Sequence, residues 1–212
     1  MKKLIAFIPF FIFFSTSAQN FLVSADKNNV LYIGVDNPLS IIVENYSSSQ
    51  ILVKADRGHI SSGYGHTYMY NGSDQEPGPV SIILYNRSTS KEFGRSTFRL
   101  KYIPDPVAKV GPSAGGNIYA VVLKNQQYIR AELENFDFNA MFGIDSFTIN
   151  IIRTDTCYFK EVINIGNKFG SEVIKALEGI KKNDIVIFKK IYALGPDGRT
   201  RILSPIIFTV TE

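Results

Sequence analysis

The string Gly111–Gly115 reads G-P-S-A-G and so matches the G-x-S-x-G pattern of a hydrolase nucleophile elbow. That elbow requires a core strand before the serine, a helix after it, and an acid and then a histidine later in the chain. Here a proline-rich stretch precedes Ser113, and both histidines, His59 and His66, lie upstream of it. Triads occur in other chain orders, but the Gly/Ser/Pro composition favours a flexible connection, and we predict no catalytic residue here.

Four residues are candidates for contact with a ligand or a partner protein: Tyr64, His66, Tyr68 and Tyr70. The last three alternate along a short strand that follows a glycine-rich loop containing Tyr64. A tyrosine offers an apolar face with a polar tip, so such a stripe can stack on a sugar ring or receive a side chain. The same alternation is typical of aromatic residues that pack inside a β-sandwich.

The other chemical groupings are weaker. Asp56 and His59 supply two metal ligands with no third at a telling spacing, and we predict no metal site. Acidic residues near Asp137 could pair like the carboxylates of a glycosidase, but any acidic surface offers such pairs. The glycine-rich loops match neither a Walker A motif nor a dinucleotide fingerprint. We therefore expect no catalytic residues, no cofactor and no enzymatic activity.

Composition narrows the class of protein. The chain has 212 residues, with 23 Lys and Arg, 19 Asp and Glu, two His, one Cys and no Trp. One cysteine cannot form an intramolecular disulfide. With 45% hydrophobic and 20% charged residues the chain can bury a sizeable core. The net charge of +4 is evenly spread, which does not favour nucleic-acid binding.

Residues 1–18 resemble a secretory signal peptide. A basic start is followed by the apolar run Leu4–Phe14 and by small residues that allow cleavage after Ala18. The alternative is a retained membrane anchor, but an 11-residue helix rises only about 16 Å, against a hydrocarbon core of about 30 Å. We expect export, without a stable membrane span, to the periplasm or cell envelope of a Gram-negative bacterium, where disulfide-free proteins are common.

The remaining chain is predicted to form two β-rich domains, 19–102 and 117–212, joined by a Pro/Gly linker over 103–116. In the first domain, short strands near 31–35, 39–44, 51–55, 80–85 and 96–102 are separated by turn signals, as in an immunoglobulin-like sandwich. In the second, Ile129 and Phe147 begin alternating strands, and the turn 195–199 joins two strands as a hairpin.

One segment of the second domain has a helical period. Phe169, Val173, Leu177 and Ile180 recur at helical spacing, with Asn167 as a suitable N-cap. This spacing predicts an amphipathic helix over about 168–182 that lies on a sheet.

Four segments together carry a family resemblance: 29–38 (NVLYIGVDNP), 98–106 (FRLKYIPDP), 136–139 (FDFN) and 195–201 (GPDGRTR). In this order they resemble the C-terminal periplasmic region of GldM, also called PorM, a protein of gliding motility and type IX secretion. The resemblance runs from about Val30 to the C-terminus.

The resemblance implies two consecutive β-rich domains, the first immunoglobulin-like and the second combining sheets with a helix, and no catalytic residues. The full-length family protein, as the resemblance implies, is a dimer anchored in the inner membrane of Bacteroidota. It acts with a membrane partner as an ion-driven motor whose distal domains reach outer-membrane ring components. A signal peptide in place of the membrane anchor makes motor function an unexpected role for this chain.

The sequence thus predicts a non-enzymatic exported protein-interaction module, an accessory of type IX secretion or gliding motility. Its expected partners are envelope proteins, including secretion-ring components, with a homodimer also open and no nucleic acid. The alternative is a periplasmic or surface β-sandwich that binds glycan or another ligand.

Overall fold

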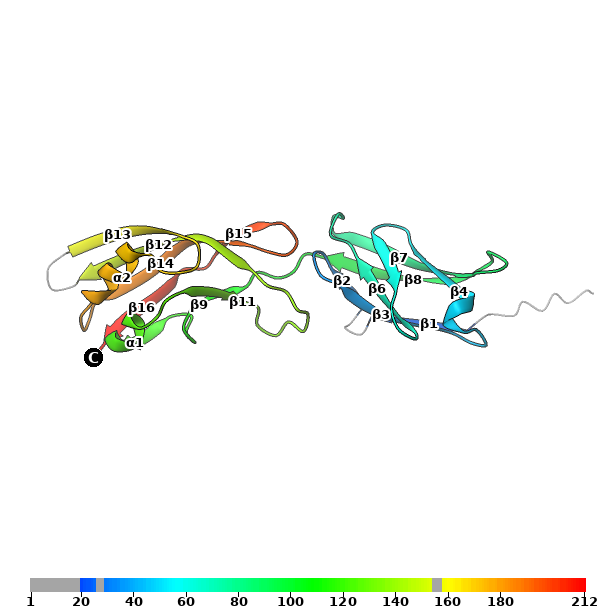
Figure 1. The fold of residues 1–212 in the computed structure, drawn as a ribbon, viewed down its shortest axis with the longest axis horizontal. Helices are drawn as coiled ribbons and strands as arrows, with labels where there is room; N and C mark the ends of the chain where they lie inside the picture. Colours follow the sequence, from blue (N-terminus) through cyan, green and yellow to red (C-terminus); the bar gives the residue numbers. More distant parts are fainter. Residues whose placement is uncertain (1–19, 26–28, 154–157) are drawn as a thin grey trace, which may run out of the picture.

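The computed structural model describes residues 20–25, 29–153 and 158–212; the predicted signal peptide lies outside them. Figure 1 shows two β-rich units in line along the long axis of the molecule, joined near residue 102. Within the described residues, no helix has the length and apolar character needed to span a bilayer.

The first domain is a sandwich of two four-stranded sheets. One has the order β1-β3-β6-β5: Phe21–Ala25, Asn37–Val43, Thr67–Asn71 and His59–Ser62. The other has the order β2-β8-β7-β4: Val30–Tyr32, Glu92–Lys101, Gly78–Asn86 and Ile51–Ala55, with β2 parallel to β8. Taken as A-B-E-D and A′-G-F-C, this is immunoglobulin-like connectivity. The predicted sandwich is confirmed, with one 3₁₀ turn at Ser48–Gln50.

Alternation along the strands builds the core of the first domain. On β8, Phe98 and Leu100 are buried while Thr97 and Arg99 are exposed. Because successive side chains of a strand point to opposite faces, each strand gives one row to the core and one to solvent. Tyr102, the next residue in this row, is only half-buried because it lies beyond the end of β8.

The second domain is built on a six-stranded sheet with the order β10-β16-β14-β12-β13, in which β15 also pairs with β14. Its strands are β10 (Gly116–Tyr119), β12 (Gly143–Arg153), β13 (Tyr158–Ile165), β14 (Ile185–Leu194), β15 (Thr200–Leu203) and β16 (Ile206–Thr211). The helices are α1 (Ala120–Lys124) and α2 (Ser171–Glu178). The predicted hairpin at 195–199 joins β14 to β15.

The stretch 103–116, expected to be an exposed linker, contains strand β9 (Val107–Val110). β9 pairs with β11 (Ile129–Glu132) in a separate two-stranded sheet. Ala108 and Val110 are buried in the core of the second domain. The part of this stretch outside regular pairing is therefore shorter than its Pro and Gly content suggests.

Helix α2 is shorter than the predicted segment 168–182, and its N-cap is Gly170 rather than Asn167. Asn167 accepts a hydrogen bond from the Ile129 N–H, and the Phe169 N–H donates to Gln127. These bonds hold residues 167–169 against 127–129, so they cannot enter a helix. Phe169 and Ile180 are still buried, just outside the helix ends.

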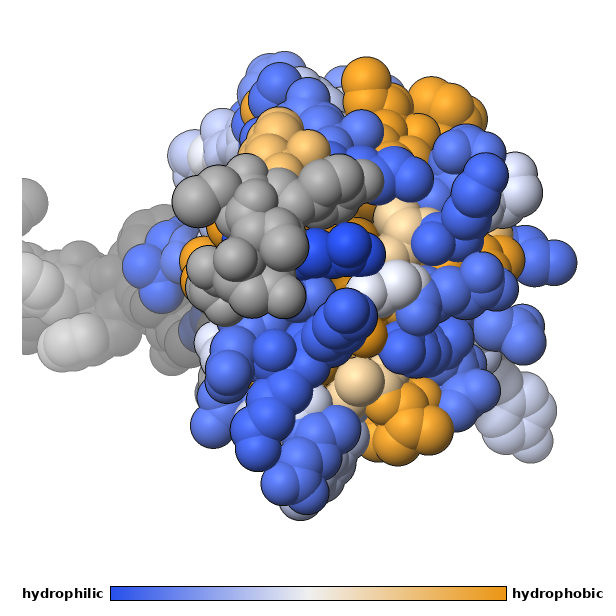
Figure 2. Space-filling model, turned by 90° about the vertical axis from the view of Figure 1, so that its left-hand side faces the viewer, coloured by the Kyte–Doolittle hydropathy of each residue, from blue (hydrophilic) through white to orange (hydrophobic). Residues whose placement is uncertain are grey.

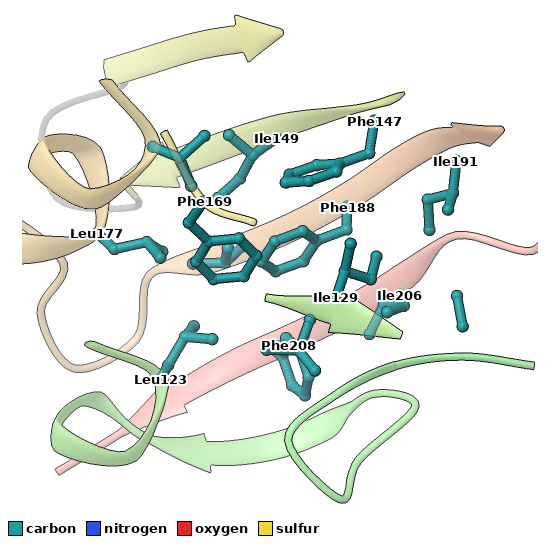
Figure 3. Packing of buried hydrophobic residues seen from close by; sticks show 14 of the residues in the cluster. Leu123, Ile129, Phe147, Ile149, Phe169, Leu177, Phe188, Ile191, Ile206 and Phe208 are labelled. Atoms are coloured by element: carbon teal, nitrogen blue, oxygen red, sulfur yellow. The ribbon is translucent and has the colours of Figure 1, made fainter. Parts of the chain in front are cut away.

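Four phenylalanines form the centre of the second core (Figure 3). Phe188 lies among the other three: its ring centroid is 5.7 Å from Phe147, 5.7 Å from Phe169 and 6.2 Å from Phe208. Each ring comes from a different element, three strands and the loop before α2. This cluster holds the helix side of the domain on the sheet.

Replacing Phe188 with alanine should lower the free energy of unfolding of the second domain by about 3–5 kcal/mol, because it removes a fully buried ring and leaves a cavity. Phe159→Ala is the matched control. Phe159 is 58% exposed on the same sheet, and its loss should change stability by less than about 0.5 kcal/mol. Urea unfolding of both variants measures the difference, and equal losses would contradict this account of the core.

Candidate functional site: the junction between the domains

The structure separates the four residues predicted to contact a ligand. Tyr64 is 98% exposed, and His66 is exposed, with Nδ1 3.3 Å from the Ser48 hydroxyl. Tyr68 and Tyr70 point into the core of the first domain and are 6% and 0% exposed. Burial raises the pKa of both phenols. The alternating aromatics of β6 are therefore core residues, and no four-residue contact stripe exists at the surface.

The other candidate groups have structural roles. The Ser113 hydroxyl donates to the Gly115 carbonyl at 2.8 Å, which closes a local turn. Asp56 accepts a hydrogen bond from the Ser81 N–H, and His59 lies 3.8 Å from Asp74 at the surface. In the part of the chain that the structure describes, no three His, Cys, Asp or Glu residues gather as a metal site would require.

The segments that carry the family resemblance meet where the two domains join. Tyr32, at the end of β2, packs edge-on against Phe136 and Phe138 of the second domain. The ring centroids are 4.9 and 5.2 Å away, and the two phenylalanine rings are 5.3 Å apart. Edge-to-face packing at these distances is favourable beyond the area it buries. One aromatic residue of the first domain thus packs against an aromatic pair of the second.

A backbone contact lies next to this cluster. Gly34 has a φ of +84°, and a Cβ placed on it would lie 2.4 Å from the backbone nitrogen of Asp197. Only glycine allows the two backbones to approach so closely in this conformation. Asn37, which is 1% exposed, holds the loop: its side-chain oxygen accepts from the Tyr32 N–H at 2.7 Å, and its amide donates to Val35 at 3.0 Å.

The strongest polar contact of the junction is made by Arg201 of β15, whose side chain is 6% exposed. Its two terminal nitrogens donate to the two carboxylate oxygens of Asp197 at 2.9 and 2.6 Å. Further bonds run to the Arg199 carbonyl, to the Asp105 carboxylate at 2.8 Å and to the Ile103 carbonyl at 3.1 Å. Five hydrogen bonds match the five N–H donors of a guanidinium. Arg201 therefore ties the hairpin turn of the second domain to the connecting segment.

A second arginine contacts the last residue before that segment. The Arg199 guanidinium lies 3.9 Å from the ring centroid of Tyr102, a cation–π distance. The Tyr102 hydroxyl donates to Glu76 at 2.5 Å, and this bond raises the pKa of the phenol. A chain of contacts thus runs from the hairpin of the second domain to the β6–β7 loop of the first.

Ionisation at the centre of the junction is fixed by these contacts. Burial raises the pKa of the Asp197 carboxyl, but the hydrogen bonds from Arg201 and from the Arg199 N–H outweigh it, so the pKa lies below its ordinary value. The hydrogen bond to Asp197 in turn raises the pKa of the Arg201 guanidinium. The pair is charged across the physiological range. The contacts of the site join the hairpin turn of the second domain to the connecting segment and to the first domain.

Sequence reasoning placed the junction segments but missed their contacts. A signal was present in the pattern Thr200-Arg201-Ile202-Leu203, in which Arg201 shares its face with the buried Leu203 while Ile202 is 67% exposed. An inward charge beside an outward isoleucine indicates a buried ion pair.

The fold and this junction define a class: a two-domain β-rich protein whose immunoglobulin-like first domain packs on the second through an aromatic cluster, beside an arginine whose five donors fix the connecting segment. Comparison with family models gives the family. The GldM third domain matches residues 20–101, and the GldM C-terminal domain matches residues 104–211. The chain belongs to the GldM family and is a component related to gliding motility and type IX secretion.

Solved structures that match this chain do so at low identity and low TM-score. Domains 6–7 of the surface layer protein SbsC share 10% identity at a TM-score of 0.31, over 91% of this chain and 99% of that one. The adhesin InvE of Yersinia pseudotuberculosis shares 9% at a TM-score of 0.30, over 92% and 59%. Tandem Ig repeats of Dlar share 9% at 0.27, over 92% and 99%. The search of curated proteins found no match.

Arg201→Lys should loosen the junction. Lysine keeps the charge but cannot make the paired bonds to Asp197 or reach the remaining acceptors, so we expect a loss of about 2–4 kcal/mol in unfolding free energy. Chymotryptic cleavage after Tyr102 should also become faster. Arg95→Lys is the control, because its pair with Glu92 is exposed and contributes little to stability. Unchanged cleavage in Arg201→Lys would contradict the assigned role.

The junction should also set the acid response. A carboxylate with a lowered folded-state pKa contributes stability above its unfolded pKa of about 4, and this is lost as pH falls through the folded value. Asp197→Asn should therefore be less stable than the parent at neutral pH, with a difference that narrows below about pH 4. Urea midpoints across this range measure it. Asp105→Asn is the control. The Asp105 side chain is 74% exposed, so its substitution should change the urea midpoint less than Asp197→Asn does.

Proposed function

We propose that this protein is a non-enzymatic, exported docking module that serves type IX secretion or gliding motility as an accessory component. The observation that supports it most directly is the match of two consecutive GldM domains over residues 20–101 and 104–211. The side chains at the domain junction are engaged in holding the two domains together, as suits a binding scaffold.

Alignment of the domains is what such a module needs. A binding surface held in its bound orientation loses less conformational freedom on association than a mobile one, and so binds more tightly for the same contacts. The bonds of Arg201 and the packing of Tyr32 on Phe136 and Phe138 supply that alignment. The expected partners are envelope proteins, with ring components at the outer membrane first among them.

Residues 1–18 support export, because they have the charge and apolar pattern of a signal peptide. A periplasmic location also fits a chain with a single cysteine, which folds without disulfides.

Chemical cross-linking in intact cells, followed by purification of the protein, tests this function. We expect ring components of the secretion system among the cross-linked proteins, and a several-fold lower yield with Arg201→Lys than with the surface control Arg95→Lys. Recovery of no secretion or gliding component with the unaltered protein would overturn the proposal. Fractionation provides a second check, since a protein retained in the cytoplasm cannot serve this role.

A further inference from the structure

Strand β13 forms an open edge of the six-stranded sheet. β12 is its partner on one side, and among the described residues no strand pairs with it on the other. The pairing with β12 runs over eight residues, from Arg153 with Tyr158 to Ser146 with Ile165, without a register shift. A long regular edge presents a row of unpaired backbone donors and acceptors.

The register shows which groups face outward. The Gly166 N–H donates to the Asp145 carbonyl, so these two residues form a hydrogen-bonded pair. In an antiparallel ladder such pairs alternate with non-bonded ones. The even-numbered residues of β13 therefore direct their backbone groups to β12. Phe159, Glu161 and Ile163 direct theirs away from the sheet, two residues apart, as an added strand would require.

The side chains of the same residues lie on the open face of the sheet. Phe159, Ile163 and Ile165 are 58%, 70% and 81% exposed, whereas Asn164 on the opposite face is buried. Glu161 lies between the apolar residues, and Lys189 neutralises it at 2.8 Å. Figure 2 looks along the molecule toward the free end of the second domain and shows apolar patches at the rim among largely polar side chains. A strand added here gains apolar contacts as well as backbone bonds.

Natural edge strands are usually blunted by proline, a bulge, a short length or charged side chains. β13 has no proline and no bulge in its pairing with β12, and it is twice as long as β10 at the opposite edge, with eight residues against four. Its charged residues are Glu161, which Lys189 neutralises, and Lys160, so the feature that remains to select a partner is one positive charge.

We propose that the β13 edge is a docking site for an extended segment of a partner protein, which adds to the sheet as a further strand beside Phe159, Glu161 and Ile163. The residues of the partner segment that lie opposite these three are apolar. Of the two residues between them, on the other face, the one beside Lys160 is acidic and the one beside Val162 is uncharged. This inference rests on the proposed function and adds the way in which a partner binds.

A second copy of this chain can pair with the edge only in some registers. Two β13 strands paired about a twofold axis at Lys160 or at Glu161 set like charges directly opposite each other, which is destabilising, whereas an axis at Val162 avoids this conflict but leaves Lys160 without an acidic neighbour. A partner strand with an acidic residue beside Lys160 has no like-charge conflict and gains a favourable contact.

Amide hydrogen exchange of the full chain tests the site with a synthetic probe: an eight-residue peptide in which isoleucine alternates with aspartate and threonine. We expect the outward amides of Phe159, Glu161 and Ile163 to exchange about tenfold more slowly at a peptide concentration ten times its dissociation constant. The amide of Val162, already bonded to β12, should not change.

Two methylated peptides serve as matched controls. N-methylation of the isoleucines removes the donors that face β13 and should abolish protection, whereas N-methylation of the aspartates and threonines, whose N–H groups point away, should preserve it. On the protein side, Ile163→Pro removes an outward donor without breaking the β12 ladder and should abolish protection. Ile163→Thr keeps that donor and should retain protection with a few-fold weaker affinity.

Equal binding of both methylated peptides would overturn the proposal, because it would show apolar contact without strand addition. Absence of protection with the unmodified peptide would overturn it too. A third result would also overturn the proposal. If sedimentation shows a dimer and the outward amides are protected without peptide, the occupant of the edge is a second copy of the chain. None of these results depends on a secretion-ring protein, so failure here is distinguishable from failure of the proposed function.

Discussion

The guanidinium of Arg201 is the constraint on which the arrangement of this protein depends. A buried arginine must have all its donors satisfied, or the energy of removing it from water is not recovered. Here the acceptors come from the hairpin turn of the second domain and from the connecting segment. Satisfying one side chain therefore fixes the path of the chain as it leaves the first domain. The aromatic contact of Tyr32 and the close approach at Gly34 are formed with the chain on that path.

The two faces of the sheet in the second domain differ in how they are covered. One face is covered by α2, the phenylalanine cluster and the small β9–β11 sheet. On the other face, exposed isoleucines lie on β13, β15 and β16, including Ile163, Ile202 and Ile207. A domain needs only one covered face to be stable. The uncovered face and its free edge are the parts of the surface where burial of apolar area remains available for association.

Sequence patterns predicted the parts of this fold that depend on local alternation. Most strands of the first domain, the hairpin after β14 and the β-rich character of both halves followed from period-two burial and turn residues, whereas β1 and β5 were not predicted. Helix α2 was predicted to begin too early, because the bonds that hold residues 167–169 against 127–129 are not local. Tyr68 and Tyr70 showed the alternation of a strand, but alternation alone does not say which face is inside. The junction was missed because its contacts join segments about a hundred residues apart, as Ile103 and Arg201 do.

The lack of space at Gly34 also limits how this protein can be rebuilt. Its backbone lies against the turn at Asp197, so the surface of each domain at the joint has the shape of the other. A chimera that takes one domain from a relative would inherit a loop fitted to a different turn. The loop at 32–37 and the turn at 195–201 would have to be exchanged together. For engineering, the two domains are therefore best exchanged as one unit.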